Sequence, residues 1–403
     1  MLIYLYPVLL LFNILPVFFY GQMNSDLERF FGVPIGYIPD LIFYFFVVLT
    51  SIITLRFHVS LWTKKLLFLG IIFLIYISIQ MLLLSADISG VVILLSFFSN
   101  FIALVLLVSF CIGKDELYLT HSVRNINVVM CFRIICGVVK LFIGYSEDSN
   151  FIVYLNRHSH RNYSTCDFYC VYSYFYRGRK SWYVSSVLYS LFFLFLDSRA
   201  GIISFAISLF FVFLQLTKKE KLLISLFFVP LLTLGISFTD IGTRLERMLS
   251  SSQVIFSGGN TLTKSQNDYR RVELVFIGVD VLKENYLIGT GLGVANYVKA
   301  IDKKFLGSTN FGLAHNFYLS YSAQLGIIGF ILLISVFYIM LSPIFKCGGY
   351  IGKGCVFALA FYVFFNEYIL TPAIYIYISI FLSVVFIRNS KYVRGIVDHF
   401  EGT

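Results

Sequence analysis

The chain has 403 residues, of which 59% are hydrophobic and only 13% are charged. About a quarter of the residues in a soluble domain are charged, so the composition excludes an ordinary soluble protein and indicates a polytopic membrane protein. The net charge of +10 could suggest a nucleic-acid partner. The topology derived below, however, places the most basic segment on the outer side of the membrane, which excludes nucleic acid.

Apolar runs predict about twelve transmembrane helices, and therefore an all-α polytopic fold that forms a single integral membrane domain over residues 1–403. The first run has no basic residues before it, so it is expected to be a retained span and not a cleaved signal. The predicted spans cover residues 2–20, 38–54, 66–84, 90–112, 126–145, 163–176, 182–197, 201–216, 222–238, 316–341, 355–368 and 370–388.

Charges between these spans predict the orientation of the chain. If the N-terminus is cytoplasmic, clusters such as Lys218, Lys219 and Lys221 fall inside, whereas the acidic Asp26 and Glu28 fall outside. This is the distribution expected from the enrichment of basic residues in short cytoplasmic loops. Both termini are therefore predicted to be cytoplasmic, and the long loop between spans nine and ten, residues 239–315, is predicted to be periplasmic.

The long loop is basic, although long loops are exempt from the charge rule. Residues 271–284 predict an amphipathic helix, because apolar residues recur there at three- to four-residue spacing: Val272, Val275, Phe276, Val279 and Leu282. The glycines of residues 289–293 predict a turn, and residues 294–305 predict a second short helix. A basic surface beside an otherwise apolar bundle suits an anionic substrate. Its basic residues are Arg244, Arg247, Lys264, Arg270, Arg271, Lys283, Lys299, Lys303 and Lys304.

Three arginines are candidates for binding phosphate. Arg199 lies between two apolar runs, where it could be a phosphate ligand or an arginine that extends to the membrane interface. Arg270 and Arg271 are predicted to open the loop helix, and helix N-termini favour anions. The planar guanidinium group can bind two phosphate oxygens at once, so one of this pair is the better pyrophosphate ligand and the other a surface charge.

Four further polar residues are candidates for chemistry or binding. His315 and Asn316 lie where the loop re-enters the membrane, and a histidine there could accept a proton at neutral pH or be a structural residue. Arg133 is an intramembrane charge, which marks either function or a buried structural pair. Glu367, near the outer end of span eleven, could bind an arginine or a sugar hydroxyl, or be structural. No metal site is predicted, because His158 and His160 have no third ligand within reach in the sequence.

Several of these segments, taken in order, resemble the O-antigen polymerase and O-antigen ligase superfamily of bacterial envelope proteins. Ser198-Arg199-Ala200-Gly201 opens a span before a long outer loop. The loop then carries Arg271-Val-Glu-Leu, Gly289-Thr-Gly-Leu-Gly and His315-Asn316-Phe-Tyr-Leu, and Gly326-Ile-Ile-Gly follows in the next span. The resemblance covers roughly residues 185–340, whereas the N-terminal half matches only in being polytopic.

The resemblance implies a glycosyltransferase in the bacterial inner membrane whose donor is a glycan on undecaprenyl pyrophosphate. Arg199 and Arg271 would hold the pyrophosphate, and His315 would act as base on the acceptor hydroxyl. Because arginines would supply the positive charge, neither a metal nor another cofactor is expected. The implied partners are the lipid-linked donor and acceptor, membrane lipids and a chain-length regulator protein. The further substrate-binding candidates are Arg270, Asn316, Glu367 and Arg133.

The predicted function is that of an O-antigen polymerase, which joins lipid-linked repeat units into O-antigen chains of lipopolysaccharide at the periplasmic face. The alternative is an O-antigen ligase, which transfers the same glycan to the lipid A core. A polysaccharide transporter or flippase is a lower alternative, because such folds commonly show matched halves, which this chain lacks.

Overall fold

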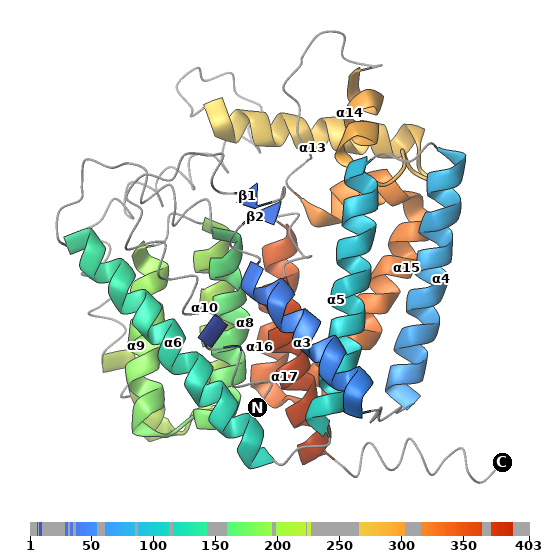
Figure 1. Ribbon diagram of the computed structural model, residues 1–403. Coiled ribbons are helices and arrows are strands. Elements are labelled where there is room, and N and C mark those ends of the chain that lie inside the picture. The colour runs from blue at the N-terminus through green and yellow to red at the C-terminus, as the bar shows by residue number, and fades with distance from the viewer. Residues whose placement is uncertain are drawn as a thin grey trace.

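The computed structural model is a helical bundle with a further helix lying across one end (Figure 1). It describes residues 38–54, 61–84, 88–112, 116–142, 159–195, 199–222, 224–226, 266–302, 316–364 and 372–389, with short pieces at 6, 8–9, 29–30 and 33–34. The two short strands β1 (Arg29–Phe30) and β2 (Val33–Pro34) pair in antiparallel fashion. The helices are α3 (Ile38–Thr54), α4 (Leu61–Leu83), α5 (Ile88–Ile112), α6 (Glu116–Phe142), α8 (Ser159–Tyr176), α9 (Lys180–Phe195), α10 (Arg199–Leu214), α13 (Gln266–Glu284), α14 (Val294–Asp302), α15 (Phe317–Cys347), α16 (Gly349–Phe364) and α17 (Pro372–Arg388).

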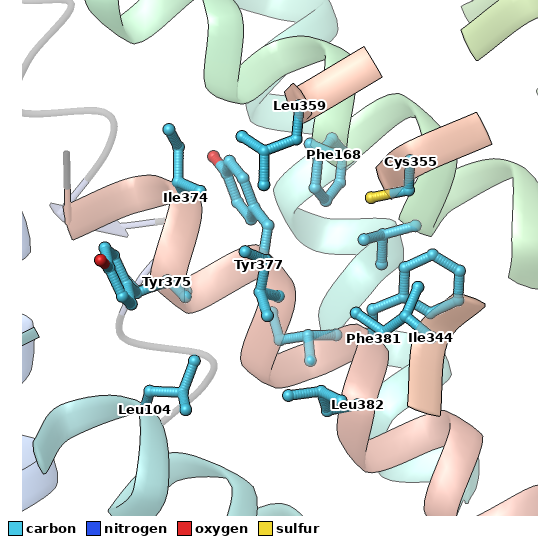
Figure 2. Packing of buried hydrophobic residues seen from close by; sticks show 14 of the residues in the cluster. Leu104, Phe168, Ile344, Cys355, Leu359, Ile374, Tyr375, Tyr377, Phe381 and Leu382 are labelled. Carbon is cyan, nitrogen blue, oxygen red and sulfur yellow. The ribbon is translucent and has the colours of Figure 1, made fainter. Parts of the chain in front are cut away.

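Helix α17 is the centre of the bundle. Every residue from 374 to 386 is buried, and a helix that is apolar on all sides is the one expected inside such a bundle. Tyr377 packs its ring against Phe168 of α8, and Phe381 packs against Tyr174 of the same helix (Figure 2). The buried hydroxyls of Ser379 and Ser383 donate to the carbonyls one turn earlier, so they add no unpaired polar group to the core.

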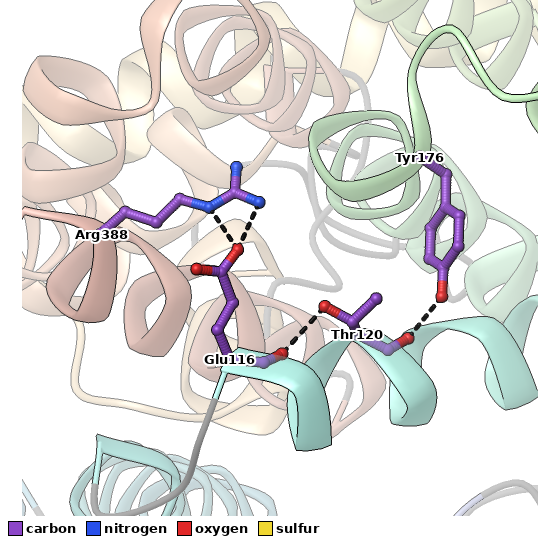
Figure 3. A network of polar contacts seen from close by, with 4 residues as sticks. All are labelled: Glu116, Thr120, Tyr176 and Arg388. Carbon is purple, nitrogen blue, oxygen red and sulfur yellow. Dashed lines mark hydrogen bonds and ion pairs between the residues drawn. The ribbon is translucent and has the colours of Figure 1, made fainter.

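A polar network closes the bundle at the end opposite α13. The guanidinium group of Arg388, the last residue of α17, lies 2.6 Å from the carboxylate of Glu116, which begins α6 (Figure 3). On the same helix, Thr120 donates to the Glu116 carbonyl, and its own carbonyl accepts from the hydroxyl of Tyr176. These contacts join the ends of α8 and α17 to the start of α6.

Six helices have the composition of membrane segments. Three described helices are long and apolar enough to cross a membrane: Trp62–Leu83, Gly90–Ile112 and Phe317–Cys347. Shorter apolar helices cover Ala200–Leu214, Gly349–Phe364 and Ile374–Arg388. The chain is thus a helical membrane protein. The total of about twelve spans stays a prediction, and the runs predicted at 2–20 and 222–238 lie largely outside the described residues.

Two predicted boundaries were wrong. Helix α6 begins at Glu116 and not at residue 126, because its first turns are polar and gave no apolar signal. Arg124, expected in a loop, therefore lies within this helix with its side chain exposed. Helix α13 begins at Gln266, so Arg270 and Arg271 lie one turn inside the helix and do not open it. The N-terminus of α13 therefore gives no support to anion binding at these arginines, contrary to the prediction.

Candidate functional site

Helix α15 is broken inside its first third. Gly326 has φ 66° and ψ 177°, so its backbone leaves the helical conformation and divides the element into a short half-helix, 317–325, and a long segment, 327–347. The break leaves the carbonyls at the end of the half-helix without their usual partners in the same helix. Inside an apolar bundle these groups need other donors, since unpaired backbone groups are costly away from water.

The turn that follows α13 supplies those donors. The N–H of Thr290 donates to the Ala323 carbonyl, and the N–H of Gly291 donates to the Gln324 carbonyl, both at 3.0 Å. In return, the carbonyl of Tyr286 accepts from the N–H of Ile327 at 2.7 Å. The broken helix and the glycine-rich turn therefore complete each other's backbone hydrogen bonds, and we call this contact the joint.

Two glycines make the joint possible. A Cβ atom on Gly289 would overlap with the carbonyl oxygen of Gln324, and one on Gly326 would overlap with the carbonyl oxygen of Leu287. Both glycines also have positive φ, 81° and 66°, a region that other residues rarely adopt. The predicted turn at 289–293 is confirmed, and its first glycine, Gly289, is required by the close approach of α15.

Side chains from α4 complete the joint. The Gln80 carboxamide donates to the carbonyl of Gln324 at 2.8 Å and, through the same nitrogen, to the carbonyl of Ile288. The hydroxyl of Tyr76 donates to the Leu325 carbonyl at 2.6 Å. From the half-helix itself, the Gln324 side-chain oxygen accepts from the N–H of Gly293 at 2.9 Å. Gln80 and Gln324 are each only 1% exposed, so these contacts are shielded from solvent.

Helix α13 packs closely on the half-helix. Its buried face consists of Leu274, Ile277 and Val281, which lie at three- to four-residue spacing. A Cβ atom on Gly278 would come within 2.9 Å of the Leu319 side chain, so a glycine is what allows this approach. Two residues of the predicted apolar face, Val275 and Phe276, are exposed, so that part of the prediction was wrong. The helix packs on α15 through the neighbouring face instead.

A small core holds α14 against α13 and α15. It consists of Tyr297 and Ile301 of α14, Ile277 and Val281 of α13, and Ala323 of the half-helix. Helix α14 covers Val294–Asp302, close to the predicted 294–305. The two helices of the basic segment are thus fixed on the bundle, at the end where the half-helix begins (Figure 1).

The starts of α10 and α15 lie at the same end of the bundle. At the opposite end, the side-chain oxygen of Gln215, which follows α10, accepts from the N–H of Ile351 near the start of α16. Since α16 begins directly after α15 ends, α10 and α15 run in the same direction toward that end. Arg199 is the first residue of α10 and Asn316 precedes α15, so both positions lie on the side of the bundle toward α13.

The structure gives only the backbone positions of three other predicted site residues. Arg270 and Arg271 belong to α13, and Arg133 lies in the second half of α6. The side chains of all three lie outside what the structure describes. His315 and Glu367 lie outside the described residues altogether. The assigned roles of all these residues, and of Arg199, stay predictions. Within the described part of the chain, no three His, Cys, Asp or Glu side chains are grouped as a metal site would require.

Asn316 has an observed role as the N-cap of α15. Its side-chain oxygen accepts from the N–H of Leu319 at 3.0 Å, and its carbonyl accepts from Ser320. Loss of such a cap costs about 1 kcal/mol. We expect Asn316→Ala to lower the melting temperature of the detergent-solubilised protein, and Asn316→Asp, which keeps an acceptor, to restore it. An Asn316→Ala protein as stable as wild type would contradict the capping role. Loss of activity in the stable Asn316→Asp variant would indicate the predicted substrate contact.

An apolar hollow adjoins the half-helix. It lies between α4, α5 and α15 and has room for only about one water molecule. Its walls include Phe317, Tyr321 and Leu325 of the half-helix and Leu292 of the glycine-rich turn. The hollow is therefore a small packing gap beside the half-helix and too small to be a substrate pocket.

Three residues of the joint, Tyr76, Gln80 and Gln324, were missed from the sequence. Gln80 and Gln324 lie inside apolar runs, where a carboxamide must find a partner because it is costly to bury alone. That cost was the one available signal, but it does not identify a partner, and the partners of Gln80 lie more than 200 residues away in the sequence.

The comparison with known families bears on the same segment. Residues 184–334 match the family model described as O-antigen ligase. The matched segment includes α10, α13, α14 and the half-helix of α15 with its break. A search of curated proteins finds no match. The family match confirms the predicted resemblance over residues 184–334, which are similar to the O-antigen ligase family.

Proposed function

We propose that this protein is an O-antigen polymerase, which transfers the growing glycan from its undecaprenyl pyrophosphate to the non-reducing end of a lipid-linked repeat unit. The observation that carries the proposal is the arrangement at the joint. Helix α13, which contains Arg270 and Arg271, is packed on the half-helix that begins directly after His315 and Asn316. The start of α10, with Arg199, lies at the same end of the bundle. A family match across all these elements supports the proposal.

In the proposed reaction, the acceptor hydroxyl oxygen attacks the anomeric carbon of the donor sugar. The bond from that carbon to the pyrophosphate oxygen breaks, and the lipid pyrophosphate leaves with the electron pair. Arg199 and Arg271 would stabilise the charge on the leaving group, which is where fixed positive groups lower the barrier most. His315 would take the proton of the acceptor hydroxyl. Arg270, Asn316, Glu367 and Arg133 are retained as proposed substrate contacts.

The proposed site is periplasmic, with both termini in the cytoplasm and the protein in the bacterial inner membrane.

The second candidate is an O-antigen ligase, because that is the printed description of the matching family. The ligase would use the same donor and the same arginines but a lipid A core acceptor. The family match does not separate the two activities, since both transfer a glycan from the same lipid pyrophosphate.

A deletion strain separates the candidates. Without the gene, we expect lipopolysaccharide that carries one repeat unit on its core, because a separate ligase can still attach a single unit. The band pattern of lipopolysaccharide on a gel measures this directly, and the reintroduced gene should restore the ladder. Core that carries no repeat unit at all would instead identify the ligase, and an unchanged ladder would contradict both candidates.

A further inference from the structure

The joint between the glycine-rich turn and the broken helix is held by a residue far away in the chain. Gln80 belongs to α4, outside the family match at 184–334. Its side-chain nitrogen donates both to Ile288, on the turn after α13, and to Gln324, at the end of the half-helix. One buried carboxamide therefore bridges the two segments that carry the proposed chemistry.

The second carboxamide makes the reciprocal contact. Gln324 lies on the half-helix, and its side-chain oxygen accepts from the N–H of Gly293, just before α14 begins. Each side of the joint thus receives a side-chain hydrogen bond in addition to its backbone pairs. Such paired contacts fix the angle between two segments more tightly than backbone pairing along one edge would.

The Gln324 carbonyl, to which the Gln80 side chain donates, also has a second hydrogen-bond donor. The Gln324 carbonyl accepts from the N–H of Gly291 as well as from Gln80. Removing the Gln80 side chain therefore leaves the Gln324 carbonyl hydrogen-bonded. We expect the joint to remain formed, but the angle between the half-helix and the turn after α13 to be less fixed. This separates a positioning role from a requirement for folding.

From this geometry we infer that Gln80 and Gln324 are positioning residues, which hold the end of the half-helix at a fixed place relative to the turn after α13, and so set the direction of both helices. The inference rests on the proposed function, because it assigns the two carboxamides the task of keeping His315 and Arg271 in register for transfer. It also makes α4, from the part of the chain that the family match does not cover, a component of the site.

The test uses the purified full-length protein and lipid-linked repeat units. We expect Gln80→Leu and Gln324→Leu to lower kcat by roughly 10- to 100-fold with KM changed less than about threefold, since small displacements of reacting groups can cost that much. Gln324→Glu keeps an acceptor for Gly293 and should recover most of the rate. Ser78→Ala is the matched control, because Ser78 is exposed on the same helix and donates only to the Leu74 carbonyl.

Hydrogen–deuterium exchange provides a readout that does not depend on activity. In Gln80→Leu, the amides of Thr290, Gly291 and Ile327 should exchange faster, while those of α17 stay protected. Faster exchange with wild-type kcat would overturn the positioning role, and so would a loss of activity that only follows the loss of folded protein. Unchanged exchange at the joint would overturn it as well.

The same experiment distinguishes failure of the proposed function. Suppose that wild-type protein transfers no glycan between lipid-linked units, while amide exchange at the joint is faster in Gln80→Leu. The proposed reaction is then wrong, but the conclusion that Gln80 stabilises the joint remains valid. If wild-type protein is active and the joint is unresponsive, the reaction stands and the positioning role is wrong.

Discussion

Strains that carry Arg271→Ala, Arg199→Ala or His315→Ala are expected to lose the O-antigen ladder and to make lipopolysaccharide with one repeat unit. Removing one preorganised charge from a developing anion costs roughly 10²- to 10³-fold in rate, and removing a general base costs roughly 10²- to 10⁴-fold. Losses of that size exceed what chain growth within a generation tolerates. Band patterns from strains that express each variant in place of the wild-type gene measure the effect.

The matched control for these variants is Lys283→Ala. Lys283 is also a basic residue of α13, but its side chain is 72% exposed and its contact with Asp280 is a surface ion pair at 3.5 Å. Such pairs contribute little. We expect this variant to make a normal ladder, and immunoblots of membranes should show all four proteins at wild-type amounts. Normal ladders in all three alanine variants would refute the assignment of the site, whereas loss in Lys283→Ala would mean that total loop charge matters and not particular arginines.

Gly326→Ala is expected to prevent formation of the folded protein. Two costs add at this position: the backbone conformation of Gly326 (φ 66°, ψ 177°), which is essentially restricted to glycine, costs an alanine about 1–3 kcal/mol, and the new Cβ would overlap with the backbone of Leu287 and Ile288. Relief of that overlap requires the turn to move off the break, which leaves the carbonyls of the half-helix unpaired inside the bundle. Thermal melting followed by size-exclusion chromatography in detergent should show aggregated protein or a strongly lowered melting temperature.

Gly349→Ala is the control for a positive φ without a close backbone approach. Gly349 has φ 63°, but a Cβ there would meet only the flexible side chain of Gln215, at 3.4 Å. We expect this variant to lower the melting temperature by only a few degrees, in line with the backbone cost alone. Equal effects of Gly326→Ala and Gly349→Ala would show that the joint does not depend on the close backbone approach.

Local patterns in the sequence predicted much of the fold. The apolar runs at 38–54 and 90–112 correspond closely to α3 and α5, and the glycines at 289–293 form the predicted turn. These features depend on neighbouring residues, so hydropathy and turn chemistry are sufficient to find them. The polar first turns of α6 and α13 were missed for the same reason, because neither carries an apolar signal.

The break in α15 could not be predicted from local patterns. The run from 316 to 341 appears as one continuous span, and nothing in it requires the conformation that Gly326 adopts. The break exists because Thr290, Gly291, Tyr76 and Gln80 supply partners for its backbone, and these lie in other parts of the chain. The candidate site was therefore predicted as a set of motifs, but the contacts that hold two of those motifs together were not.

The break also determines how α15 fits the thickness of a bilayer. As one straight helix, its 31 residues would rise about 46 Å, well beyond a hydrocarbon core of about 30 Å. The roughly 21 residues after Gly326 rise about 31 Å, so they alone are enough to cross that core. The half-helix Phe317–Leu325 is then not needed for the crossing and is free to lie at the level of the lipid head groups. In the proposed function, that depth is where the pyrophosphate of a membrane-embedded carrier would lie, so the substrate would react without leaving the bilayer.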